Sequence, residues 1–346
     1  MRPGLDPASE VLFLPLQTGA LAWPAPGRGR VLGARAGEAA NAARAQSLLF
    51  EQPFRPWAAA LERDGHRVVA ELDGTPADAV DLVLVRAPRQ RLESRATLAR
   101  ALALAGGHGV VVACTGNQEG ARSLQADLAA LAGPLTVESR AHCRVMWTRP
   151  GAAGFAPALR AEWAALDAPR PVREGRFTSR PGVFAWDRID AGSALLIEAL
   201  PADLTGQGAD LGAGIGVLAD AVLARAPGVT GLDLFEANAR ALALARRNLA
   251  GARVPLGFHW HDVAAGVPGR YDFIVTNPPF HAGREDDPGL GRAFIAAAAA
   301  ALRPRGRLLL VANRHLPYEG ALAAGFADVR VLRDAGGYKV IGAVKA

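Results

Sequence analysis

Short apolar runs alternate with helix-like stretches along most of the chain. In the first part, strands are predicted at residues 66–72, 81–85 (DLVLV), 109–114 (GVVVAC) and 137–147, after a short strand and small-residue turn within 29–37. The predicted helices are an alanine-rich stretch reaching about residue 50, and residues 57–62, 95–105 and 117–131. Residues 1–30 show no clear periodicity. Strands that alternate with helices predict a parallel sheet covered by helices on both faces.

The second part of the chain repeats this order of elements. Aligning residues 81–85 with residues 272–276 (DFIVT) places RAPR opposite NPPF. Upstream, VLGARAG aligns with DLGAGIG, with Arg35 in place of Gly214. We interpret the two parts as copies of one fold, in which the first copy has lost the residues that would hold a small ligand. A chance similarity between two α/β domains is the alternative.

The sequence thus predicts an α/β protein with two tandem Rossmann-like domains, the first of them degenerate. We expect a first domain over residues 1–167, a linker over 168–181 and a second domain over 182–346. The linker, APRPVREGRFTSRP, is rich in Pro and Arg. Its arginines could contact phosphates, although a solvated connector is the more common role of such a stretch.

A glycine-rich segment, GADLGAGIG, lies at residues 208–216. It predicts a strand ending at Asp210, then the alternate glycines Gly212, Gly214 and Gly216, then a helix. Glycines let the backbone turn tightly against a ligand, and a helix N-terminus points free N–H groups at it. The segment also weakly matches the dinucleotide fingerprint. A leading Asp before three alternate glycines suits S-adenosylmethionine, which has an amino-acid tail and no pyrophosphate.

Two further carboxylates follow predicted strands. Residues 231–233 (GLD) are expected to end a strand, which would let Asp233 accept both ribose hydroxyls of a cofactor. Asp262 follows the strand-like residues 256–260 and could accept an adenine amino group. A solvated carboxylate at a strand end is the alternative for both residues. The nearby His-x-His-Asp pattern lacks a third His or a Cys, so we expect no metal.

Residues 271–281, YDFIVTNPPFH, predict a buried parallel strand that stops at a double proline. Open α/β sheets bind ligands at this end of their strands. The Asn277 side-chain oxygen and the carbonyl of Pro278, held by the fixed proline φ angles, can accept both hydrogens of an exocyclic NH2 group. Phe280, after Pro279, offers a face on which a base can stack. An ordinary strand exit is the alternative.

Length and charge extend this picture. With 346 residues, 50% hydrophobic and 21% charged, the chain has the composition of roughly two globular domains. The net charge of +6 favours an anionic partner such as nucleic acid. The excess is +3 on each side of residue 172, so no separate basic tail carries it.

Cysteine usage and hydropathy bear on the compartment. Cys114 and Cys143 match no metal or redox spacing and are expected to be buried thiols in a reducing compartment. The longest uncharged stretch, residues 11–27, contains three prolines and is too short to span a bilayer. We therefore expect a cytoplasmic protein.

These motifs resemble those of class I methyltransferases, and more narrowly of the RsmC-type small-subunit ribosomal RNA guanine-N2 methyltransferases. The resemblance covers most of the chain: the duplicated architecture, FTSRPG and DAGSALL before the glycine motif, NPPFH, and VANRHLPYEG followed by GYKV. NPPF alone occurs in many enzymes that methylate planar amino groups. NPPFH together with VANRHLPYE is much more specific.

The resemblance implies that the second domain binds S-adenosylmethionine and methylates N2 of a guanine in 16S ribosomal RNA. Its partner would be small-subunit RNA or the assembled 30S particle, and the first domain would help stability and RNA positioning. The oligomeric state stays open, with a monomer as the expectation. Carried over by position, the cofactor residues are Asp210, Gly212, Gly214, Gly216, Asp233 and Asp262, and the guanine-holding residues are Asn277, Pro278, Pro279 and Phe280.

The sequence departs from the family at WDRI, which is extra material before DAGS, and at Ala213, where a cysteine is common. The extra residues leave the substrate-side loop undefined. Rival hypotheses are methylation of a large-subunit guanine, an adenine amine or a protein glutamine amide, and a non-catalytic RNA-binding scaffold. Glutamine-methylating relatives usually have Tyr in place of Phe280 and a helical leading domain. A scaffold predicts a decayed cofactor loop in both copies, unlike the intact loop here.

Overall fold

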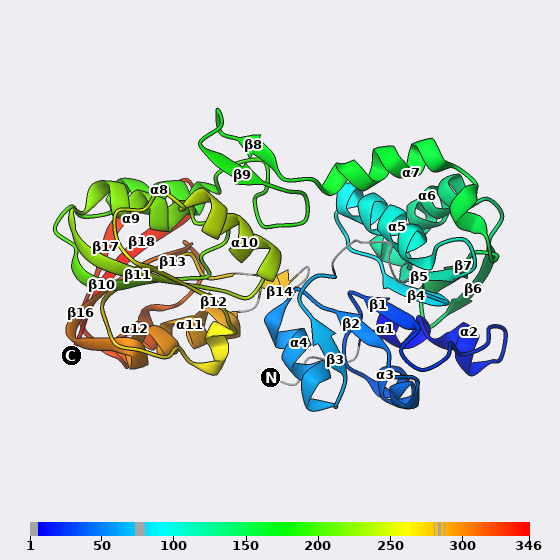
Figure 1. The fold of residues 1–346 in the computed structure, drawn as a ribbon. Coiled ribbons are helices and arrows are strands. Elements are labelled where there is room, and N and C mark those ends of the chain that lie inside the picture. The colour runs from blue at the N-terminus through cyan, green and yellow to red at the C-terminus, as the bar shows by residue number, and fades with distance from the viewer. Residues whose placement is uncertain (1–5, 73–79, 280, 283–284, 287) are drawn as a thin grey trace. The chain divides into compact units, whose positions relative to one another are not determined.

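The computed structural model describes residues 6–72, 80–279, 281–282, 285–286 and 288–346. The chain divides into two compact units (Figure 1). Unit 1 comprises Met1–Pro169 and Arg180–Gly182, and unit 2 comprises Arg170–Ser179 and Val183–Ala346.

Unit 1 alternates strands and helices as the apolar pattern predicts. Its strands are β1 (Gly29–Leu32), β2 (Leu49–Glu51), β3 (Arg67–Val69), β4 (Leu82–Arg86), β5 (Val110–Gly116), β6 (Thr136–Arg140) and β7 (Cys143–Trp147). Its helices are α1 (Pro7–Val11), α2 (Leu14–Gln17), α3 (Glu38–Ala42), α4 (Arg55–Arg63), α5 (Arg91–Ala105), α6 (Ala121–Ala132) and α7 (Pro157–Ala164).

Unit 2 opens with a hairpin of β8 (Arg170–Val172) and β9 (Phe177–Ser179). Its other strands are β10 (Thr205–Leu211), β11 (Gly228–Glu236), β12 (Leu256–Trp260), β13 (Tyr271–Thr276), β14 (His281–Ala282), β15 (Glu285–Asp286), β16 (Leu302–Asn313), β17 (Phe326–Ala335) and β18 (Tyr338–Lys345). Its helices are α8 (Ala191–Ala199), α9 (Val217–Arg225), α10 (Ala239–Asn248), α11 (Pro288–Ala301) and α12 (Glu319–Ala323).

The two units share one sheet topology. The strand order is β3-β2-β1-β4-β5-β7-β6 in unit 1 and β12-β11-β10-β13-β16-β18-β17 in unit 2. In each sheet the first five strands run parallel, while β7 in unit 1 and β18 in unit 2 pair antiparallel to their neighbours. The sheet order confirms the predicted α/β fold and shows that the two seven-stranded sheets correspond strand for strand.

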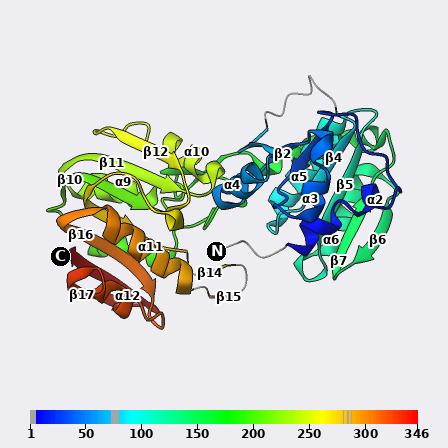
Figure 2. The same cartoon turned by 90° about the horizontal axis from the view of Figure 1, so that it is seen from below.

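The seven-stranded sheet of unit 2 is covered by helices on both faces, which buries its central strands on both sides (Figures 1 and 2). One core cluster joins α8, α9 and α10 to one face, through residues such as Leu196, Leu218 and Leu242. A second cluster joins α11 and α12 to the other face, through Ile295 and Leu322. Burial on both faces explains why the strands read as near-continuous apolar runs in the sequence.

Several predicted elements differ in the structure. The alanine-rich helix expected to reach residue 50 is α3, which ends at Ala42, and Phe50 lies fully buried in β2. Residues 137–147 form an antiparallel hairpin of two strands, and not a single strand. Residues 1–30, where no pattern was found, contain the short helices α1 and α2. Tertiary packing overrides weak local signals in each case.

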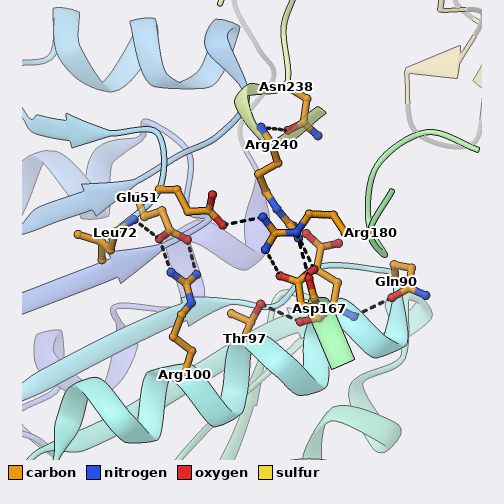
Figure 3. Close-up of polar contacts among 11 residues, drawn as sticks. Glu51, Leu72, Gln90, Thr97, Arg100, Asp167, Arg180, Asn238 and Arg240 are labelled. Carbon is orange, nitrogen blue, oxygen red and sulfur yellow. Dashed lines mark hydrogen bonds and ion pairs between the residues drawn. The ribbon is translucent and has the colours of Figure 1, made fainter. Parts of the chain in front are cut away.

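The predicted linker also has structure, since β8 and β9 pair in it. Two of its arginines have acidic partners: Arg176 pairs with Asp220, and Arg180 lies 3.0 Å from Glu71 and also pairs with Asp167 (Figure 3). The segment is therefore more ordered than a solvated connector. Cys114 and Cys143 are buried free thiols, as expected.

Candidate active site

The C-terminal edge of four parallel strands brings together the glycine loop, Asp262 and Asn277 of unit 2. Strand register places Leu211 of β10 opposite Phe235 of β11 and Thr276 of β13, while Glu236 of β11 lies opposite Trp260 of β12. The Thr276 hydroxyl donates to the Leu211 carbonyl at 2.7 Å, which ties the ends of β10 and β13. The segments that follow these strands therefore share one edge, where such sheets bind ligands.

The glycine loop follows β10 at this edge. Gly212, Gly214 and Gly216 all have left-handed φ angles, of 75°, 56° and 91°, which favour glycine. A Cβ added at Gly216 would lie 3.0 Å from the Leu249 side chain, so that glycine allows close helix packing. A Cβ added at Gly214 would meet no heavy atom within 4 Å. The loop thus leaves open space at its centre.

Asp210, the last acidic residue before this loop, is fully buried. Neither of its carboxylate oxygens has a hydrogen-bond partner of normal geometry among the described residues. Burial, and then the nearby charge of Glu236, raise the pKa of Asp210 to about 8, against a smaller lowering by the Ala219 amide. A buried carboxylate without a normal hydrogen bond is unusual, and such groups are concentrated at functional sites.

Glu236, which the sequence analysis missed, reaches the glycine loop. Its carboxylate accepts the N–H of Gly214 and the N–H of Asn238, both at 2.7 Å. Burial raises the pKa of Glu236, while these backbone hydrogen bonds oppose the rise. A signal was present in the sequence, because LFE occurs at the end of both β2 and β11.

Asp233 does not end its strand as predicted. β11 continues to Glu236, which leaves Asp233 three residues, or roughly 10 Å, short of the edge. Its carboxylate accepts the Tyr271 hydroxyl at 2.9 Å and lies 3.4 Å from His259. Burial and this hydrogen bond raise the pKa of Tyr271. Asp233 therefore belongs to a polar cluster on the face of the sheet.

Asp262 lies at the edge, two residues after β12. It caps the short 3-10 helix Val263–Ala265, because its side chain accepts the Ala264 N–H at 3.0 Å. Val263 beside it is buried. The predicted position of Asp262 at a strand end thus agrees with the structure, and its second oxygen is left for other donors.

Asn277 follows β13 directly and is held by the start of α8. Its Nδ2 donates to Asp190 at 2.9 Å and to the Ser193 hydroxyl at 2.8 Å. Its Oδ1 is buried and has no hydrogen-bond partner among the described residues. Pro278 is buried and Pro279 is exposed.

Phe280 lies outside the described residues. The structure therefore adds nothing to the predicted stacking role of this residue. The sequence analysis gave no role to Asp190 or Ser193, although both lie in the DAGSALL phrase.

In unit 1, charged side chains occupy the corresponding edge. Arg86, at the position of Asn277, lies 3.1 Å from Asp6 and 2.7 Å from Glu119 in nearly buried ion pairs. Arg35, at the position of Gly214, lies 3.7 Å over the Trp57 ring.

Glu51, at the position of Glu236, pairs with Arg100 and accepts the Leu72 N–H (Figure 3). Arginines thus stand where unit 2 has a glycine and an amide. Of the carboxylates at this edge, Asp6 and Glu119 pair with Arg86, and Glu51 pairs with Arg100.

The family model that matches the chain falls almost wholly within unit 2. Residues 174–342 match the family described as Methyltransferase small domain. The sheet order, the glycine loop and the Asn-Pro-Pro turn make unit 2 a class I methyltransferase domain, and unit 1 repeats its topology.

The chain belongs to the ribosomal RNA small subunit methyltransferase C family. A protein of that name from Chromohalobacter salexigens is 37% identical over 235 residues, which cover 66% of this chain and 68% of that protein. Proteins of the same name from Hahella chejuensis and Psychromonas ingrahamii are 36% and 34% identical, over 61% and 49% of their lengths. The chain thus spans from about half to about two thirds of the length of these curated relatives.

A solved structure extends the similarity to both units. The 16S rRNA N2 methyltransferase RsmC of T. thermophilus, solved in complex with AdoMet and guanosine, has a TM-score of 0.79 and 26% identity to this chain. The match covers 100% of this chain and 93% of that chain. The duplicated architecture is therefore shared along the whole length.

Within the described part of the chain, no helix is long and apolar enough to cross a membrane. The same residues contain no cluster of three His, Cys, Asp or Glu side chains that could hold a metal ion.

Proposed function

We propose that this protein transfers a methyl group from S-adenosylmethionine to the exocyclic N2 amine of a guanine in 16S ribosomal RNA. Family membership and the T. thermophilus enzyme, whose title names AdoMet and guanosine, support this proposal. The observation that carries it is the buried Oδ1 of Asn277, which has no hydrogen-bond partner among the described residues and lies at the same sheet edge as an open glycine loop.

The residues at this edge fit the cofactor. The open space beside Gly214 would admit the amino-acid end, next to the unpartnered carboxylate of Asp210. Glu236 is our choice for the ribose hydroxyls, because its carboxylate lies at the edge and keeps unused lone pairs. Asp262 would accept the adenine amino group. Bound there, S-adenosylmethionine supplies a methyl group that is already electrophilic, since it is attached to a positively charged sulfur.

The chain's own contribution is to orient the guanine amine. This amine is a poor nucleophile because its lone pair is delocalised into the ring. The Asn277 Oδ1 and the Pro278 carbonyl would accept its two hydrogens, so that the lone pair localises on nitrogen and points away from both acceptors. Such alignment, in a site that excludes water, lowers the barrier without a strong base. The methylated nitrogen carries a positive charge and is strongly acidic, so it would release its extra proton to water as the product leaves. Phe280 would stack on the base after it leaves its helix.

The proposed partner is small-subunit RNA, either free or in the 30S particle, and the proposed place of action is the cytoplasm, where this RNA is assembled. The net charge of +6 supports an anionic partner. We propose that the protein acts as a monomer.

Mapping of the product tests the reaction. The purified protein, incubated with 30S particles and isotope-labelled S-adenosylmethionine, should place label in N2-methylguanosine of 16S RNA, as read by nuclease digestion and mass spectrometry. Label in adenine, in 23S RNA or in protein would show that the methyl group goes to that substrate and not to a guanine of 16S RNA. No transfer to any of them would contradict the activity itself.

Asn277→Ala tests the residue that carries the proposal. Loss of the amide acceptor should lower kcat by roughly 100-fold, because the amine is no longer aligned. The dissociation constant of S-adenosylmethionine, measured by calorimetry, should remain unchanged. An unchanged kcat would remove Asn277 from the chemistry.

A further inference from the structure

The helix N-terminus beside Asn277 forms a closed set of hydrogen bonds. Asp190 is the N-cap of α8, and its Oδ2 accepts the Ser193 N–H at 3.0 Å. The same oxygen accepts the Asn277 Nδ2 at 2.9 Å, and the Ser193 hydroxyl accepts that Nδ2 at 2.8 Å. Both hydrogens of the Asn277 amide thus have an acceptor on α8.

The chemistry of these partners fixes which way the amide faces. A carboxylate only accepts hydrogen bonds, so the group beside Asp190 must be the NH2 of Asn277 and not its oxygen. A half-turn of the amide would bring Oδ1 against the carboxylate, which is repulsive. The Asn277 Oδ1 is therefore directed away from α8, where it is buried without a partner among the described residues.

Unit 1 contains the same arrangement of an Asp and a Ser at a helix N-terminus, but an arginine takes the place of Asn277. DPAS at Asp6 to Ser9 corresponds to DAGS at Asp190 to Ser193, and Asp6 likewise precedes a helix. There the Ser9 hydroxyl donates to Asp6 at 2.6 Å, and Arg86, at the position of Asn277, lies 3.1 Å from the same carboxylate. In both units the carboxylate therefore contacts the side chain at the C-terminal end of the fourth strand of the repeat, which is Arg86 in β4 and Asn277 directly after β13.

We infer that Asp190 and Ser193 are positioning residues, which lock the Asn277 amide with its oxygen toward the substrate amine. This inference rests on the proposed methyl transfer. In unit 1 the carboxylate is neutralised by Arg86, and no amide is presented. In unit 2, Asp190 and Ser193 fix the orientation of the Asn277 amide, so that its oxygen serves as the acceptor. The same hydrogen-bonding arrangement therefore supports catalysis in unit 2 and only stability in unit 1.

Asp190→Asn separates the orienting role from helix capping. Asn is as good an N-cap as Asp, so the melting temperature should change little. An amide at this position no longer dictates which end of Asn277 faces it, and kcat should fall at least tenfold with an unchanged dissociation constant for S-adenosylmethionine. Ser193→Ala should also lower kcat, and Ser193→Thr should restore it. Ser9→Ala in unit 1, the matched control, should leave kcat unchanged.

A reversed pair gives the sharper test. Asn277→Asp alone sets two carboxylates side by side and should inactivate the enzyme. In the double variant with Asp190→Asn, the new amide at position 190 donates to the new carboxylate at position 277. The other oxygen of that carboxylate stays available to accept a hydrogen of the substrate amine. The double variant should therefore exceed Asn277→Asp at least tenfold in kcat. A double variant no more active than Asn277→Asp, or an Asp190→Asn variant with wild-type kcat, would overturn the inference.

A readout without turnover separates this inference from the reaction. The side-chain NH2 signals of Asn277, assigned by their loss in Asn277→Ala, should exchange slowly with solvent in wild type and faster in Asp190→Asn. Slow exchange in a protein that methylates no guanine would refute the proposed function but keep the locked amide. Equally fast exchange in both proteins would refute the lock.

Discussion

At the scale of single residues, Asp210 is a carboxylate buried at the sheet edge. It has no normal hydrogen bond among the described residues, and burial raises its pKa from 3.8 to about 8. The folded protein therefore keeps a proton on Asp210 between these pH values, whereas the unfolded chain does not. Stability must fall as pH rises through this window, because the folded state binds more protons than the unfolded state.

Asp210→Asn should remove this pH dependence. At pH 8 the cofactor-free variant should be more stable than wild type by roughly 2–5 kcal/mol, because each unit of pKa shift corresponds to about 1.4 kcal/mol. The difference should shrink toward pH 4. Melting temperatures measured from pH 5 to 9 test this, and a difference that is constant over the range would contradict it.

We expect substitutions of Glu236 and Asp233 to differ in their effect on the affinity for S-adenosylmethionine. Glu236→Gln should weaken binding of S-adenosylmethionine by roughly 10- to 100-fold, since hydrogen bonds to a charged group contribute about 1.5–3 kcal/mol. Asp233→Asn is the control, because Asp233 is engaged by Tyr271 on the sheet face. Calorimetry decides between them, and a loss of affinity only in Asp233→Asn would restore the assignment made from the sequence.

At the scale of elements, the two glycine loops differ in the side chain at their middle position. Gly33 and Gly37 of unit 1 correspond to Gly212 and Gly216, but Arg35 stands in place of Gly214. The Arg35 side chain extends from this loop and packs over the Trp57 ring of α4. At the corresponding Gly214 of unit 2, the space that a side chain would enter is open.

Gly214→Arg should therefore convert the open loop into a filled one. We expect S-adenosylmethionine binding to be lost, while the left-handed φ of 56° adds strain of roughly 1–2 kcal/mol. Gly27→Arg is the matched control, because Gly27 of unit 1 has a φ of 80° and equally open surroundings. Binding that survives in Gly214→Arg would show that the cofactor does not use this space.

At the scale of the whole molecule, positive charge is spread over both units. The sequence carries +3 on each side of residue 172, and no block of basic residues accounts for the net charge of +6. A distributed charge suits contact with a folded RNA over a broad surface better than capture by a tail.

Affinity for 16S RNA should therefore fall steeply with salt. Each phosphate contact should add about 0.7–0.9 to the slope of log affinity against log salt concentration, through counterion release. Filter binding between 50 and 300 mM salt measures this slope for the full chain. A slope near zero would contradict a phosphate-based interface.

The sequence by itself determined the fold and its duplication, and it predicted the glycine loop after β10 and the place of Asn277 at the end of β13, because alternation of apolar residues and turn-forming Gly and Pro act over a few neighbouring positions. Only the tertiary structure decided that Glu236, and not Asp233, reaches the edge, since the end of a strand depends on pairing with its neighbours. It alone joined Asp190 to Asn277, which lie 87 residues apart. Such distant partners leave no local pattern in the sequence. DPAS and DAGS are similar segments, but their common role follows only from the structure, which places each of them next to the corresponding strand, β4 or β13.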